Sequence, residues 1–213
     1  LEEAVQITER DGGQVTVLTL GPVEAEEQLR YAASVGAHKI ILVPTNGSAW
    51  DPQRTAAALT VAIQTAEETN GEPFELILFG NESADSGGFQ VGVRVAHKLG
   101  RPIVNAIKGI DPGDGAVTAR REIDAGFEVY NVATPAVLGV KEGINLPRYP
   151  TMKGRLASKK AELTNAEIVA EAGGQTLVKL HRPAEQVSNT EILGTDESAA
   201  GAVVDILEEI GLC

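Results

Sequence analysis

Small and polar residues are concentrated in one segment of the chain, between residues 80 and 92. Glycines let a backbone approach an anion closely, and the unpaired N–H groups at the start of a helix attract negative charge. The segment therefore predicts a phosphate-binding loop, although the same composition also suits a plain turn with a helix cap. It matches neither the P-loop nor the GxGxxG pattern. The residues assigned to the loop are Gly80, Ser83, Asp85, Ser86, Gly87, Gly88, Phe89, Gln90, Val91 and Gly92.

A second segment, residues 148–160, is locally cationic within a strongly acidic chain. It places Met152 and Leu156 among lysines and arginines. Apolar anchors supply affinity in a protein interface, and the charges around them supply orientation. The segment therefore predicts a docking element for another protein, and a solvated basic loop is the alternative.

The remaining composition argues against several other classes of function. A formal charge of -12 disfavours nucleic acid as a partner, since affinity for phosphate backbones rests on lysine and arginine. No apolar run approaches the ~20 residues that span a bilayer, which predicts no membrane insertion. The histidines at positions 38, 97 and 181 have no metal-ligand spacing, and no serine-nucleophile motif or acid–base pair stands out. We therefore expect no metal site and no catalytic residue in this chain.

The candidate phosphate loop belongs to a regular alternation of strands and helices. Apolar, β-branched runs predict strands, and apolar residues at helical spacing predict helices between them. Such an alternation is typical of an α/β fold with a mostly parallel sheet covered by helices, in which ligands bind beyond the carboxyl ends of the strands. The strands are expected at 15–20, 39–43, 74–80 and 103–107, and the helices through 25–35, 51–66 and 91–99.

The regular alternation of strands and helices ends after residue 110. A tight turn is expected at 111–115, followed by an antiparallel hairpin of 117–123 and 127–132 and a buried strand at 135–140. Beyond it the sequence predicts a short extended piece at 176–180 and a last helix at 197–210. We expect one α/β domain over residues 1–160 and an extended arm over 161–213 that ends in this helix.

Several segments together resemble the beta subunit of electron-transfer flavoproteins. They are Arg121–Gly126, Thr134–Val137, Asn145–Thr151 with Lys159 and Lys160 after it, Gly21-Pro22 with the following helix, the 80–92 loop and the last helix. The resemblance covers essentially the whole chain. The family's usual first strand and hairpin, which lead into an Asn-Pro segment before the helix that starts here at Leu1, have no counterpart.

The resemblance implies a Rossmann-like electron-carrier subunit that works in a heterodimer. The larger alpha subunit would carry the redox FAD, and this chain would hold AMP, pack its arm on the alpha subunit and dock acyl-CoA-type or other flavin dehydrogenases. A cytoplasmic location is expected for a bacterial protein, and the mitochondrial matrix for a eukaryotic one. A stand-alone α/β nucleotide-binding protein is the alternative from another class.

The resemblance also assigns roles to single residues. The 80–92 loop matches the family's nucleotide-phosphate loop, which usually ends in Gln-Thr-Gly in AMP-binding members. Here it ends in Gln90-Val91-Gly92, which is similar to electron-bifurcating members that hold a second FAD in this subunit. Glu122 corresponds to the acid that meets the mobile flavin domain of the alpha subunit. The residues expected to dock dehydrogenases are Arg148, Tyr149, Leu156 and Met152, which stands where the family usually has Leu.

Overall fold

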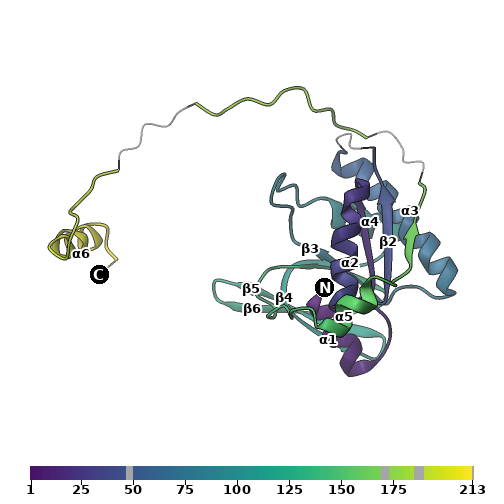
Figure 1. The fold of residues 1–213 in the computed structure, drawn as a ribbon. Helices are drawn as coiled ribbons and strands as arrows, with labels where there is room; N and C mark the ends of the chain where they lie inside the picture. The colour runs from purple at the N-terminus through teal and green to yellow at the C-terminus, as the bar shows by residue number, and fades with distance from the viewer. Residues whose placement is uncertain (47–49, 169–172, 185–189, 213) are drawn as a thin grey trace. The chain divides into compact units, whose positions relative to one another are not determined.

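The computed structural model describes residues 1–46, 50–168, 173–184 and 190–212 of the chain. The chain divides into two units, Leu1–Leu177 and Val178–Cys213, which are described separately. Figure 1 shows that helices and strands alternate through most of the first unit. The α/β class expected from the sequence is confirmed.

The first sheet has three parallel strands in the order β1-β2-β8: β1 (Thr16–Gly21), β2 (Lys39–Pro44) and β8 (Leu163–Asn165). One face of it is covered by α1 (Glu2–Asp11) and α2 (Glu26–Ser34), which follows a short 3-10 turn. Val5, Leu29, Ile40 and Leu42 form the buried core between them. The strand β8 pairs with β2, and the compact unit continues to Leu177. The division of the chain at residue 160 stays a prediction.

The second sheet has five strands in the order β3-β7-β4-β5-β6. The pairings of β3 (Leu76–Gly80) with β7 (Ala136–Val140) and of β7 with β4 (Ile103–Gly113) are parallel. The pairings of β4 with β5 (Ala116–Ile123) and of β5 with β6 (Gly126–Ala133) are antiparallel, as the predicted hairpin requires. The turn expected at 111–115 is shorter than predicted, because β4 stays paired with β5 as far as Gly113.

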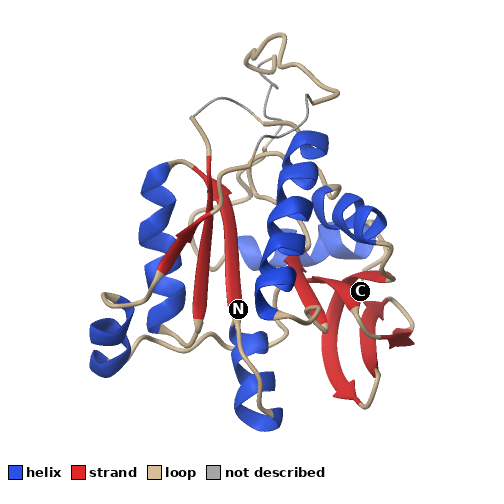
Figure 2. Cartoon of the chain, turned by 90° about the vertical axis from the view of Figure 1, so that its right-hand side faces the viewer, coloured by secondary structure: helices blue, strands red, loops and turns tan. Residues whose placement is uncertain are grey.

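Two helices join the sheets into one body. Figure 2 shows the strands of the first unit in two separate groups with helices beside them. The helices α3 (Pro52–Asn70) and α4 (Val91–Leu99) share a buried cluster. Leu18 and Leu20 of β1 pack against this cluster, and so do Ile77 and Phe79 of β3. The loops that enter α3 and α4 therefore meet at the same end of the domain.

The helix α5 (Met152–Ser158) was not predicted, and it lies in the cationic segment. It begins at Thr151, whose hydroxyl accepts a hydrogen bond of 3.0 Å from the backbone N–H of Gly154. In the second unit, the helix α6 (Ala199–Glu209) confirms the last predicted helix, and none of its residues is buried. The extended piece expected at 176–180 belongs to no strand of the described residues.

Candidate functional site

The N-terminus of α4 has the features of an anion site. Its first turn follows Gln90, and in the described part of the chain no side chain caps it. The first N–H groups of such a helix have no partner within the helix and lie at the positive end of its dipole. The amide oxygen of Gln90 instead accepts hydrogen bonds of 3.2 and 3.0 Å from Arg94.

The loop before α4 turns its backbone in a way that suits an anion. Gly87 and Phe89 have φ angles of 53° and 51°, and Gln90 returns to the right-handed region. Alternation of left- and right-handed residues directs successive N–H groups toward one point, which is a common anion-binding arrangement. The loop is also tied by a 2.6 Å hydrogen bond between the hydroxyls of Ser83 and Ser86 and by a 2.9 Å bond from the N–H of Gly87 to the carbonyl of Ser83.

Two predicted loop residues have a structural role. A Cβ at Gly92 would lie 3.1 Å from Cγ of Phe79, so glycine lets α4 pack closely on β3. Val91 packs against the buried cluster under α3 and α4, which leaves no side-chain donor at this position for a ligand. The loop residues from Glu82 to Gly87 are exposed, so the loop projects from the domain.

A cavity of about 430 Å³ begins where β3 ends. Gly80 is the one predicted loop residue in its lining, and residues 83–92 are not part of it. Its walls are mainly apolar and come from α1, α2, β3, β7 and the segment after β7. These walls were not predicted, because they depend on contacts between distant segments. The apolar lining residues are Leu1, Tyr31, Val35, Leu78, Phe79, Val140, Ile144 and Pro147.

The neighbouring helix α3 begins differently. The carboxylate of Asp51 accepts a 2.8 Å hydrogen bond from the N–H of Arg54, and Pro52 occupies the first turn. It also accepts a 2.9 Å bond from the N–H of Gln175. These backbone N–H groups, Arg54 first, lower the pKa of Asp51. A Cβ at Gly88 would lie 3.9 Å from Pro52, so the two helix starts are close neighbours.

The predicted docking residues lie on and just before α5, and their surroundings differ. Tyr149 and Met152 are 90% and 75% exposed, and Leu156 is 61% exposed. The guanidinium of Arg148 is instead bound by the carboxylates of Glu2 and Glu9 on α1. Leu146, which the sequence reasoning missed, is 90% exposed. Its signal was present in the sequence, as an apolar residue next to the predicted docking segment.

A family model described as "Electron transfer flavoprotein domain" matches residues 1–171. The chain belongs to the electron transfer flavoprotein family. An electron transfer flavoprotein subunit beta from Mycobacterium leprae is 38% identical over 218 residues, which cover 94% of this chain and 79% of that relative. Another from Syntrophomonas wolfei is 32% identical over 201 residues, with coverage of 94% and 77%. The family model and these relatives confirm the resemblance seen in the sequence. Beta subunits of this family are electron carriers rather than enzymes.

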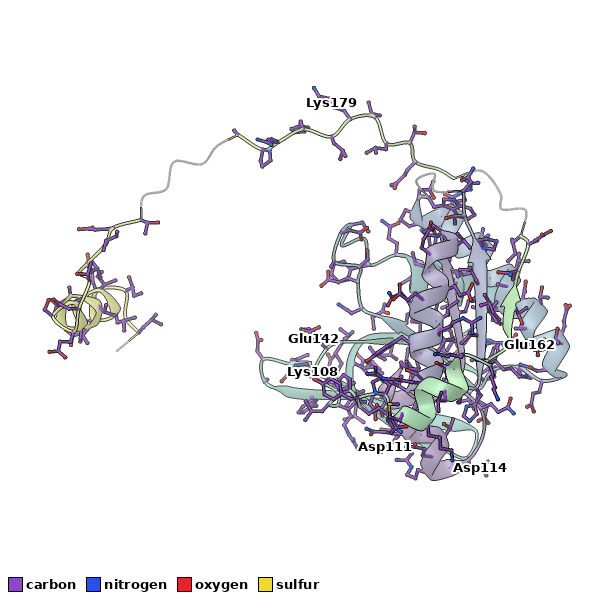
Figure 3. The ribbon with its side chains drawn as sticks, in the orientation of Figure 1. Lys108, Asp111, Asp114, Glu142, Glu162 and Lys179 are labelled. Atoms are coloured by element: carbon purple, nitrogen blue, oxygen red, sulfur yellow. The ribbon has the colours of Figure 1, made fainter. Side chains whose placement is uncertain are left out.

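Glu122, the other residue assigned from the family resemblance, lies on β5 and forms an ion pair with Lys108 of β4. The hydrogen bond between them lowers the pKa of Glu122 and raises the pKa of Lys108. Glu142, labelled with Lys108 in Figure 3, raises the pKa of Lys108 further. The carboxylate of Glu122 is still 49% exposed. Glu122 is therefore charged and accessible, but a partner's cation would compete with Lys108 for it.

An apolar patch that was not predicted lies beside Glu122. Phe127 stands opposite Glu122 in the β5–β6 ladder, and Val129 is two residues further along the same face. Both side chains are more than half exposed. Alternation along the predicted strand 127–132 was the signal that could have revealed this patch.

Two absences agree with the expectations for this family without testing them. In residues 1–46, 50–168, 173–184 and 190–212, no group of three or more His, Cys, Asp or Glu side chains could hold a metal ion. No helix of the described chain is long and apolar enough to span a membrane. The cytoplasmic location stays a prediction.

Proposed function

We propose that this chain is the nucleotide-holding and docking subunit of an electron-transfer flavoprotein heterodimer, whose alpha subunit carries the redox FAD. The observation that carries the proposal is the uncapped N-terminus of α4 beside the cavity at the end of β3. Family membership supports the heterodimer, since the relatives from Mycobacterium leprae and Syntrophomonas wolfei are named as beta subunits.

AMP fits the two parts of this site by its chemistry. The apolar walls of the cavity suit a base, and the free N–H groups of α4 with the turns at Gly87 and Phe89 suit a phosphate. Gly80 connects the two, because it lines the cavity and starts the loop. The bound nucleotide would supply no redox chemistry in this role and would brace the loop against the domain.

A second FAD in this subunit is the alternative, which the Gln90-Val91-Gly92 ending favours by its similarity to electron-bifurcating members, since valine has no hydroxyl for a phosphate. Denaturing the native heterodimer and weighing the released nucleotides by mass spectrometry separates the two. AMP and FAD in equal amounts support the proposal. Two FAD per heterodimer support the alternative, and FAD alone at one per heterodimer would rule out a nucleotide in this subunit.

For docking, we propose that Met152 enters an apolar pocket of a partner dehydrogenase. Met152 is 75% exposed at the start of α5, so its truncation removes an anchor without opening a core. Met152→Ala should weaken electron transfer from an acyl-CoA dehydrogenase by about 1–2 kcal/mol in kcat/KM. Val23→Ala, at a 65% exposed apolar residue elsewhere in the unit, is the control and should change nothing. Equal kinetics for both variants would contradict the role of Met152.

For the arm, we propose that residues 161–213 end in a helix that packs on the alpha subunit. Within α6, Val203, Val204 and Ile206 are more than 40% exposed. Exposed apolar surface of this kind is typical of a protein interface. Ile206→Ser should reduce the fraction of heterodimer in size-exclusion chromatography at low concentration. Glu208→Ser on the same helix is the control, and equal losses in the two variants would argue against the packing.

A further inference from the structure

Arg148 is the centre of a network that ties the docking segment to α1. Its Nε lies 2.9 Å from Oε2 of Glu2, and its Nη1 lies 2.6 Å from Oε1 of Glu9. Its Nη2 donates to both carboxylates, at 3.0 and 2.8 Å, and its backbone N–H donates to Glu2 at 3.1 Å. Asn145 extends the network with a 2.7 Å hydrogen bond to Glu3.

The burial of Glu2 sets its pairing with Arg148 apart from an ordinary surface ion pair, whereas Glu9 is 58% exposed. The side chain of Glu2 is only 9% exposed, and that of Arg148 is 34% exposed. A guanidinium that shares its donors between two carboxylates has a fixed orientation, which a single lysine could not reproduce. The hydrogen bonds from Arg148 also lower the pKa of Glu2 to about 2, so Glu2 is charged at neutral pH.

The other side of the docking segment is fixed on α2. A Cβ at Gly154 would collide with the carbonyl oxygen of Ser34, so α5 packs on α2 through its bare backbone. Arg30 of α2 donates a 3.0 Å hydrogen bond to the carbonyl of Ser158, at the last residue of α5. The segment between Asn145 and Ser158 is therefore attached at both of its ends.

The exposed apolar residues lie between these two attachments. Leu146 and Tyr149, on either side of the Pro147-Arg148 pair, are each 90% exposed, and Met152 follows three residues later at the start of α5. Because the backbone at Arg148 is held on α1, the side chains beside it are turned to solvent. The exposed cations Lys153, Arg155, Lys159 and Lys160 follow in the same segment, so the surface fits an apolar pocket with an acidic rim.

We infer that Arg148 is a positioning residue, which holds Leu146 and Tyr149 outward as additional anchors for the partner dehydrogenase and does not itself contact the partner. This inference rests on the proposed docking function. It differs from the expectation that Arg148 docks the partner directly, which stays a prediction. An arrangement formed in advance lowers the entropy that the segment loses on binding, so the network acts on affinity rather than on electron transfer within the complex.

The test uses the full heterodimer with an acyl-CoA dehydrogenase as electron donor. Arg148 also lines the cavity at the end of β3, so the variants are compared at equal nucleotide content. Under that condition Arg148→Ala should raise KM for the heterodimer roughly tenfold and leave kcat unchanged. Arg155→Ala is the matched control, since it removes the same charge from the same segment and the structure shows no ion pair for it among the described residues. Its effect on KM should be smaller and should disappear in high salt.

The variant Glu2→Gln decides between positioning and direct contact. If Arg148 positions the segment, weakening its partner raises KM, and Arg148→Lys restores docking only in part. If Arg148 contacts the dehydrogenase, Glu2→Gln frees the guanidinium and leaves KM unchanged or lower, which would overturn the inference. Hydrogen exchange of residues 145–152 gives a readout without the dehydrogenase: it should accelerate in Arg148→Ala and not in Arg155→Ala.

The same experiments separate this inference from the docking proposal. If the dehydrogenase docks on another surface, Met152→Ala and Leu146→Ala both leave KM unchanged. Hydrogen exchange of residues 145–152 still accelerates in Arg148→Ala. If docking is correct and the inference is wrong, Met152→Ala raises KM while exchange of residues 145–152 is the same in the wild type and in Arg148→Ala.

Discussion

The helices α3 and α4 start side by side, but the N–H groups of their first turns are treated in opposite ways. The start of α3 is closed. Asp51 accepts a hydrogen bond from the N–H of Arg54 on one carboxylate oxygen and from the N–H of Gln175 on the other, and Pro52 has no N–H to satisfy. The start of α4 is open, with no capping side chain among the described residues and a preceding loop with left-handed turns at Gly87 and Phe89. The first arrangement stabilises a helix, and the second leaves donors for a ligand.

A helix N-terminus indicates a ligand site only when no side chain already accepts hydrogen bonds from its first N–H groups. A carboxylate cap and a bound phosphate compete for the same N–H groups and the same end of the helix dipole. The negative charge of Asp51 would repel an anion at α3. At α4 the cost of the missing cap, about 1 kcal/mol, is consistent with selection for a ligand rather than for stability.

The largest effect should come from filling the contact that holds α4 in place. In Gly92→Val, the added side chain meets the ring of Phe79, from which a Cβ would be only 3.1 Å away. Overpacking of this kind costs about 1–3 kcal/mol. Urea unfolding should show this loss, and Gly88→Val, where the nearest atom would be 3.9 Å from the Cβ, should show much less. Similar losses at both positions would mean that α4 is not positioned by this contact.

The next prediction concerns a substitution that gives α4 a carboxylate cap like that of α3. Gln90→Asp places a carboxylate at the N-cap, which should stabilise the nucleotide-free protein by up to ~1 kcal/mol. It should also lower the nucleotide content of the purified heterodimer about tenfold, the equivalent of ~1.4 kcal/mol, because the carboxylate repels a phosphate. Gln90→Asn is the uncharged control. Full nucleotide content in Gln90→Asp would place the phosphate elsewhere.

The starts of both helices could be predicted from the sequence. Asp51-Pro52 predicted the start of α3, and the segment 91–99 predicted α4 without error, because caps, glycines and apolar spacing act over a few residues. The 80–92 loop was likewise visible as a local composition. Its anion-binding role stays a proposal.

Features that depend on distant segments were not visible. The helix α5 has only seven residues and contains Gly154, and it forms where its backbone meets α2. The strand β8 exists as a partner of β2, and the cavity walls come from five separate elements. The sequence assigned Arg148 to a cationic surface, since nothing nearby indicated that Glu2 and Glu9, ~140 positions away, would bind it.

The third prediction concerns a substitution that removes the side-chain cap of α3. Asp51→Ala removes the acceptor of the Arg54 N–H and should cost about 1 kcal/mol of unfolding free energy, within the 0.5–2 kcal/mol range of lost caps. Nucleotide content should not change, because the ligand belongs to α4. Asp51→Asn retains a capping oxygen and should lose only a fraction of this. A loss of nucleotide in Asp51→Ala at unchanged stability would reverse the roles assigned to the two helices.

The smallest effect is the pH dependence of the same cap. The N–H groups of Arg54 and Gln175 lower the pKa of Asp51 from its ordinary value of 3.8, so the folded state favours the charged carboxylate. This contribution is complete above pH 3.8 and is lost as the pH falls through the lowered pKa. The difference in unfolding free energy between the wild type and Asp51→Asn should therefore be constant from pH 7 to 5 and shrink below pH ~4. A difference that stayed constant down to pH 2 would show that the charge of Asp51 contributes nothing to closing α3.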